Sequence, residues 1–213
     1  MNTKQFIENI QILREEYKNW NAPIVTLISV QTKDPYKVLV STLLSLRTKD
    51  EVTAQASYKI FEKADTPEKM IKLHEEEVRK LIYPVGFYKQ KSKTLIEISQ
   101  ILIDKYGSKV PDSLDELLKF KGIGRKTANL VLSLGYGQDT ICVDTHVHRI
   151  SNRWGIHNTK DPEETEFSLM EKIPKKYWSE INDLLVAFGQ TICRPIGPKC
   201  ELCKVKYCPV RKK

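Results

Sequence analysis

The stretch LLKFKGIGRKTANLVLSLGYG, residues 117–137, places Gly122 and Gly124 between two segments whose apolar residues recur at helical spacing. Glycine permits a positive φ and a close approach of backbones, so we expect a tight hairpin here. The N–H groups that open the second helix would face outward and could bind a DNA phosphate. An ordinary turn between helices is the simpler interpretation. The continuation Arg125-Lys126-Thr127-Ala128, whose small residues let the two helices pack closely, favours a helix-hairpin-helix instead.

Apolar residues at helical spacing continue through the rest of the chain, for example in FIENIQILREEYKNW (6–20) and KTLIEISQILIDKY (93–106), and no alternating strand pattern stands out. Residues that commonly start or stop helices agree with these patterns. The sequence therefore predicts an all-α protein. The start and stop signals are, in chain order, Thr66-Pro67, Gly107, Ser113 to Glu116 as a capping box, Gly155 and Asp161-Pro162.

The 213-residue chain is basic, with 35 Lys and Arg against 27 Asp and Glu and a formal net charge of +8. A basic surface favours a polyanionic partner through neutralisation of phosphates. No stretch approaches the roughly 20 apolar residues that a membrane span needs, and the first residues contain no apolar signal core. We therefore expect a cytoplasmic protein, associated with the nucleoid when bound to DNA, with no membrane partner.

Lys126 follows the glycine hairpin and falls in the first turn of the second helix. A single lysine is usually a solvated surface charge. Here the positive end of the helix dipole and the neighbouring Lys121 and Arg125 would favour the neutral amine that nucleophilic attack on carbon requires. Lys126 is therefore the candidate nucleophile.

Asp144 lies 18 positions after Lys126 in TICVDTHVHRISNRWG, residues 140–155, close to the expected start of a helix. Its simplest role is that of an N-cap, and a capping carboxylate has a defined direction and stays ionised. Such an anion could also stabilise an oxocarbenium-like sugar and help to prime the lysine. We expect His146 to pack or to contact phosphate, and Arg149 to bind phosphate or to lie on the helix surface.

Four of the five cysteines, Cys193, Cys200, Cys203 and Cys208, follow the pattern C-x6-C-x2-C-x4-C. In a reducing compartment, such clustering indicates metal ligation rather than disulfides. Four thiolates can surround a tetrahedral zinc ion or an iron–sulfur cluster, and the chemistry of the ligands alone leaves both open. The metal centre would stabilise a tail that is too short and too polar to fold alone.

Together, GIGRKTANLVL (122–132), VDTHVHR (143–149) and the four cysteines resemble, in this order and over essentially the whole chain, the endonuclease III family of helix-hairpin-helix DNA glycosylases. The resemblance implies a six-helix domain with the helix-hairpin-helix, residues 28–138. It also implies a discontinuous helical domain, residues 1–27 and 139–213, that holds a [4Fe-4S] cluster through the four cysteines. DNA would lie in a cleft between the two domains.

By the same resemblance, Lys126 matches the family nucleophile, which displaces the base at C1′ and forms a Schiff base before β-elimination cuts the strand. Asp144 matches the essential carboxylate. The partner would be double-stranded DNA with damaged bases or abasic sites, and the main substrates would be oxidised pyrimidines in extruded nucleotides. The protein is expected to be a monomer.

Two loops would fill the gap left by the extruded nucleotide. Arg47 stands where the family commonly has glutamine, and Phe87 replaces an aliphatic wedge, although a surface charge and core packing are equally open interpretations of these two residues. Lys121 stands where proline is frequent and could add a phosphate contact, and the last cysteine spacing is x4 where x5 is usual. The predicted DNA-binding residues are Arg47, Phe87, Lys121, Gly122, Gly124, Arg125, Thr127, His146 and Arg149.

Two other functions remain open on the sequence. A mismatch glycosylase that removes thymine or uracil opposite guanine would share this architecture. A non-catalytic DNA-binding module would use the hairpin to bind phosphate and the metal only to hold the tail. The combination of Lys126 with Asp144 speaks against the module, because binding alone requires neither residue.

Overall fold

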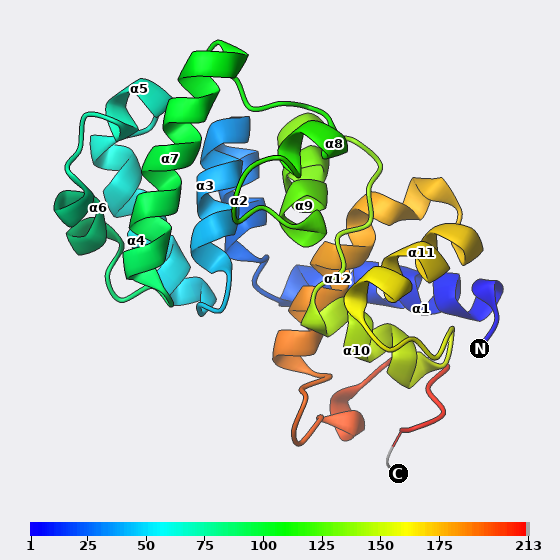
Figure 1. Cartoon of the computed structure of the whole chain (residues 1–213). Helices are drawn as coiled ribbons and strands as arrows, with labels where there is room; N and C mark the ends of the chain where they lie inside the picture. The colour runs from blue at the N-terminus through cyan, green and yellow to red at the C-terminus, as the bar shows by residue number, and fades with distance from the viewer. Residues whose placement is uncertain (212–213) are drawn as a thin grey trace. The chain divides into compact units, whose positions relative to one another are not determined.

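Every regular element of the computed structural model, which describes residues 1–211, is a helix (Figure 1). The prediction of an all-α protein is confirmed. The chain divides into two compact units, one of residues Ile24–Gln138 and one that joins Met1–Pro23 to the segment from Asp139 onward. Within the described residues, no helix is both long enough and apolar enough to cross a membrane. Lys212 and Lys213, the last residues of the predicted second domain, lie outside the described part.

The unit of residues 24–138 contains six helices of eight residues or more and two helices of four residues. They are α2 (Ile24–Thr32), α3 (Pro35–Ser45), α4 (Asp50–Lys63), α5 (Pro67–Met70), α6 (Glu75–Ile82), α7 (Tyr88–Tyr106), α8 (Leu114–Leu117) and α9 (Arg125–Tyr136).

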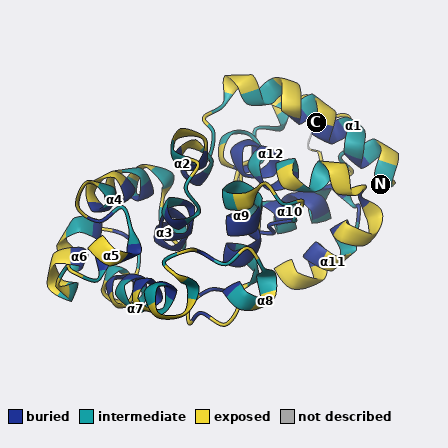
Figure 2. Cartoon of the chain, turned by 90° about the horizontal axis from the view of Figure 1, so that it is seen from above, coloured by how far each residue is buried: buried dark blue, intermediate teal, exposed yellow. Residues whose placement is uncertain are grey.

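Helix α3 is the centre of this unit. It contacts α2, α4, α7 and α9, and most of its residues are buried (Figure 2). A helix that is apolar on nearly all sides has to be enclosed by other helices, and the segment VLVSTLL (38–44) has this composition. The neighbours of α3 include α7, whose N-cap is the candidate wedge residue Phe87, and α9, which carries the candidate nucleophile.

The unit formed by both ends of the chain has its own core around Phe6, Trp154 and Phe188. The ring centroids of Phe6 and Trp154 lie 5.5 Å apart, and those of Trp154 and Phe188 lie 6.1 Å apart. Its elements are α1 (Thr3–Glu16), η1 (Tyr17–Asn19), α10 (Thr145–Trp154), α11 (Pro162–Lys172), η2 (Lys175–Tyr177), α12 (Trp178–Thr191) and η3 (Cys200–Leu202).

The helix signals of the sequence are confirmed with one exception. Thr66 and Asp161 cap α5 and α11, and each is followed by proline at the first helical position. Gly107 and Gly155 end α7 and α10 with positive φ. The capping box at Ser113 is wrong: Ser113 precedes α8, but its side chain makes no capping hydrogen bond. Helix α8 has only four residues and ends at Leu117, one position after Glu116, the glutamate of the expected box.

Asn9 joins the two ends of the chain. This fully buried residue of α1 donates from Nδ2 to the carbonyl of Tyr207 (2.8 Å) and accepts from the Tyr207 N–H (3.2 Å). Because Tyr207 precedes Cys208, this pair of hydrogen bonds holds the last cysteine segment against α1.

We predict that Asn9→Leu, which keeps the branching and the number of heavy atoms of the side chain but removes both bonds, lowers the free energy of unfolding by about 1–2 kcal/mol, because the Tyr207 backbone groups lose their partners. Chemical denaturation measures this change. Gln11→Leu, on the exposed side of the same helix, is the control and should change stability much less. Equal effects of the two substitutions would contradict the prediction.

Candidate functional site

The hairpin between α8 and α9 has the expected backbone. Gly122 has φ +89°, and the Ile123 N–H closes the turn on the Phe120 carbonyl (3.1 Å). Gly124 is the N-cap of α9 with φ −100°, so only one of the two glycines needs the left-handed region. The first hydrogen bond of α9 runs from the Ala128 N–H to the Gly124 carbonyl (2.9 Å). The N–H groups of residues 125–127 therefore lie in the turn that typically binds anions.

The side chains around the hairpin differ in exposure. Lys121 is exposed, whereas Arg125 and Lys126, the first two residues of α9, are partly buried. Thr127 is only 2% exposed, so its side chain packs inside the unit. Any DNA contact of Thr127 would therefore have to come from its backbone N–H.

Asp144 is the N-cap of α10, as the sequence predicts. Its Oδ1 accepts from the N–H groups of His146 (2.8 Å) and Val147 (2.9 Å), and the residue is only 9% exposed. Two backbone donors fix the direction of this carboxylate. Asp144 belongs to the unit formed by both chain ends, whereas Lys126 belongs to the unit of residues 24–138.

Two arginines of α10 contact the first cysteine. Arg149 donates from Nη2 to the Cys193 carbonyl (2.9 Å) and lies 3.2 Å from Nδ1 of His146. Burial lowers the pKa of the Arg149 guanidinium. Arg153, one turn later, donates to Cys193 Sγ (3.5 Å) and to the Arg194 carbonyl (2.8 Å). The helix that begins at Asp144 is thus connected to the first residue of the cysteine cluster.

The four clustered cysteines are all partly buried, and Cys193, Cys203 and Cys208 pack against the core of their unit. Burial raises the pKa of the Cys203 and Cys208 thiols. Four thiols in one short segment have the donor chemistry of a zinc or iron–sulfur site. In residues 1–211, however, no set of three or more His, Cys, Asp or Glu side chains is arranged so that it could hold a metal ion.

Arg47 and Phe87 come together in the unit of residues 24–138. The Arg47 guanidinium carbon lies 5.4 Å from the centroid of the Phe87 ring, and both residues have a positive φ, +53° and +58°. The Phe87 side chain is not part of the core, because the residue is 58% exposed. This excludes core packing as the role of Phe87 and leaves an aromatic ring with a cation stacked on it at the surface.

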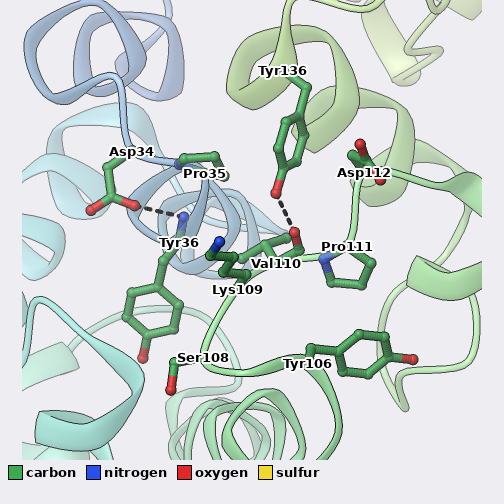
Figure 3. Close-up of a pocket in the computed structure, with 10 residues that line it drawn as sticks. All are labelled: Asp34, Pro35, Tyr36, Tyr106, Ser108, Lys109, Val110, Pro111, Asp112 and Tyr136. Atoms are coloured by element: carbon green, nitrogen blue, oxygen red, sulfur yellow. Dashed lines mark hydrogen bonds between the residues drawn. The ribbon is translucent and has the colours of Figure 1, made fainter.

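A pocket of about 520 Å³ in the same unit contains none of the predicted site residues (Figure 3). Tyr136 donates from its hydroxyl to the Val110 carbonyl, and Asp34 accepts from the Tyr36 N–H (2.9 Å), so these polar groups contribute to the fold.

Lys91 and Arg153 are two buried or partly buried cations that we did not predict from the sequence. Lys91 is buried at the start of α7, and a signal for it exists: residues 91, 95, 98 and 102 follow helical spacing, and the other three are apolar and buried. A lysine on a buried stripe needs a partner inside the protein. The signal for Arg153 is weaker, because it is only the four-residue spacing from Arg149.

Comparisons with known proteins agree with this fold. The sequence profile of the "HhH-GPD superfamily base excision DNA repair protein" family matches residues 40–175. The helices and the hairpin thus define a helix-hairpin-helix protein of base excision DNA repair. The chain is 51% identical over 173 residues to endonuclease III of Thermotoga maritima, covering 81% of each chain. The chain therefore belongs to the endonuclease III family, as its motifs predict.

Solved structures give the same result. A trapped covalent intermediate of endonuclease III with DNA, an estranged-adenine complex, has a TM-score of 0.88 and 31% identity to this chain, covering 98% of this chain and 96% of that one. A thermostable thymine-DNA glycosylase has a TM-score of 0.80 and 27% identity, covering 97% and 95%.

We predict that Gly122→Ala destabilises the hairpin by about 1–2 kcal/mol, because alanine is strained at φ +89°. A Cβ there would also lie 3.4 Å from Thr94 Cγ2. Gly124→Ala is the matched control, because its φ is negative and a Cβ would meet nothing within 4 Å. Thermal unfolding of the two variants tests the difference. A loss at position 124 as large as that at 122 would contradict it.

Proposed function

We propose that this protein removes oxidised pyrimidines from double-stranded DNA and then cleaves the abasic strand, with Lys126 as nucleophile and Asp144 as the assisting carboxylate. The observation that carries the proposal is the position of Lys126 in the first turn of α9, directly after the hairpin, in a chain 51% identical to an endonuclease III. The similarity to a trapped covalent intermediate with DNA supports a covalent mechanism.

In the proposed reaction, the neutral Nζ of Lys126 attacks C1′ of the sugar while the bond to the base breaks, and the base leaves with the bonding electron pair. Loss of the proton on nitrogen and opening of the sugar ring give a Schiff base. Removal of a proton at C2′ then expels the 3′ phosphate and cuts the strand, and water releases the lysine. The buried carboxylate of Asp144 stabilises the positive charge that develops on the sugar.

We assign DNA contacts to two surfaces. Lys121, the backbone of Gly122 and Gly124, Arg125 and the Thr127 N–H would bind phosphate at the hairpin. His146 and Arg149, which both lie in the first half of α10, would add contacts near Asp144.

Arg47 and Phe87 would fill the space of the extruded nucleotide. The exposure of Phe87 and the cation stacked on its ring support this role. An aromatic wedge stacks on the neighbouring bases, and a guanidinium can hydrogen-bond the unpaired base.

We further propose that Cys193, Cys200, Cys203 and Cys208 hold a [4Fe-4S] cluster, with zinc as the alternative. A cluster bound there would stabilise the C-terminal segment. The donor types, and the packing of Cys193, Cys203 and Cys208 against one core, support the proposal. The protein would act as a monomer, in the cytoplasm and on the nucleoid.

A mismatch glycosylase is the second candidate function. The similarity to a thymine-DNA glycosylase, with a TM-score of 0.80, favours it as an alternative. Duplexes with thymine or uracil opposite guanine separate the two candidates from each other, because only the mismatch enzyme would release these bases faster than thymine glycol.

For the chemistry, we predict that wild-type protein incubated with a thymine glycol duplex and borohydride forms a covalent adduct and that Lys126→Ala forms none. Lys119→Ala, at an exposed lysine just before the hairpin, is the control and should retain the adduct. Asp144→Asn should still bind the duplex but lose about 100-fold or more in turnover, because it removes the anion while an amide oxygen can still cap the helix. Absence of any wild-type adduct, also on an abasic duplex, would exclude the lyase.

For the metal centre, we predict that the purified protein absorbs broadly in the visible range and contains about four iron atoms per chain, as a [4Fe-4S] cluster requires. Cys203→Ser should lose this absorbance, whereas Cys142→Ser, at the buried cysteine outside the cluster, should keep it. Zinc in place of iron in elemental analysis would contradict the assignment.

A further inference from the structure

Lys91 has an unusual environment for a lysine. It is only 8% exposed, and its Nζ donates to the carbonyls of Leu44 (2.9 Å) and Leu46 (2.6 Å) and to Thr48 Oγ1 (3.4 Å). Burial lowers the pKa of this ammonium group to about 8. All three acceptors belong to one segment, the end of α3 and the loop after it, so the side chain connects α7 to that segment.

The acceptors explain why a buried lysine is stable here. The last carbonyls of a helix have no partner within the helix and carry partial negative charge. Helix α3 ends at Ser45 without a glycine, and Leu46 leaves the helix with φ −58° and ψ +118°. Lys91 supplies the donors that the end of α3 needs, and it does so from another helix.

Lys91 also bonds the second loop, the segment around Gly86 and Phe87 that precedes α7. Its backbone N–H donates to the Phe87 carbonyl (3.0 Å). Next to Phe87, the Gly86 N–H donates to Thr48 Oγ1 (3.1 Å), and a Cβ on Gly86 would collide with the Arg47 carbonyl oxygen. The two loops are therefore in backbone contact, with Lys91 bonded to both.

Arg47 and Phe87 occupy the exposed side of this assembly. Each has the left-handed backbone conformation that is unfavourable for residues other than glycine, so the surrounding contacts have to maintain it. Without donors at the end of α3, the loop could relax to another path, and the Arg47 guanidinium would no longer lie over the Phe87 ring.

We propose that Lys91 is a positioning residue for lesion extrusion: it caps α3 from α7 and thereby holds Arg47 and Phe87 as one preformed wedge. This inference rests on the proposed function, in which those two residues enter the DNA. If the two side chains are already ordered in the free protein, DNA binding does not have to include the loss of conformational entropy that ordering them would require. Lys91 itself does not touch the reacting atoms, and its effect on the reaction passes through the loop.

The decisive variant is Lys91→Met, which has similar length and no donor. Lys105→Met, the same change at an exposed lysine at the other end of α7, is the control. We expect Lys91→Met to excise thymine glycol opposite adenine about tenfold more slowly in single turnover, the ratio that corresponds to about 1.4 kcal/mol of lost positioning. On the same strand with an abasic analogue opposite the lesion, where no pair has to be opened, the rate should stay within about twofold of wild type.

A double-mutant cycle separates positioning from a general structural effect. In a Phe87→Ala background, Lys91→Met should cause little additional loss, because the wedge it would hold is already missing. An unchanged tenfold loss in that background, or an equal loss on both substrates, would overturn the proposal. So would wild-type rates in a folded Lys91→Met protein.

Two further measurements keep the test informative. If Lys91→Met does not fold, Thr48→Val is the alternative variant. At nearly constant side-chain volume, it removes the hydroxyl that accepts from Lys91 Nζ and from the Gly86 N–H. It should slow excision of the lesion paired with adenine more than excision opposite the abasic analogue. Fluorescence of 2-aminopurine beside the lesion reports unstacking without any chemistry. Wild-type protein that unstacks the DNA but never forms an adduct would refute the proposed reaction alone, whereas equal unstacking by wild type and Lys91→Met would refute the positioning role alone.

Discussion

An α-helix leaves its first N–H groups and its last carbonyl groups without partners inside the helix, and the candidate functional residues of this protein lie where those groups are. Lys126 stands in the opening turn of α9, and Asp144 caps α10. Arg47 follows the end of α3, Phe87 precedes α7 and Cys193 follows α12. The requirement to satisfy helix termini therefore determines where these candidate residues lie, because the backbone groups at helix ends bind either the protein's own caps or an anionic partner.

Two glycines are enough to form the turn and the helix start of the hairpin. Gly122 supplies the positive φ that turns the chain, and Gly124 begins α9 without a side chain to cover its first N–H groups. At the start of α10, in contrast, Asp144 caps the helix with its own side chain. Its carboxylate satisfies two N–H groups of α10, and the same two bonds give an anion with a fixed direction. One helix start thus has the backbone geometry of an anion site, and the other fixes the direction of a carboxylate.

Polar side chains that are wholly or partly buried connect these termini to the rest of each unit. Lys91 joins the end of α3 to the start of α7, and Arg153 joins α10 to Cys193. Asn9 holds the segment before Cys208 on α1. Each of these side chains satisfies backbone or sulfur acceptors that would otherwise be poorly solvated, which is the condition under which burying a polar group stabilises a protein.

The sequence alone determined the helical class, most of the caps, the glycine hairpin, the capping position of Asp144 and the cysteine cluster, because these features depend on residues within a few positions of one another. The tertiary structure decided the rest. Lys91 bonds a carbonyl 47 positions away, Arg153 a sulfur 40 positions away, and Asn9 a backbone 198 positions away. Whether Phe87 faces solvent or the core also depended on how α3 and α7 pack. Contacts over such separations depend on which helix surfaces meet, and helical periodicity specifies that a surface is apolar without specifying its partner.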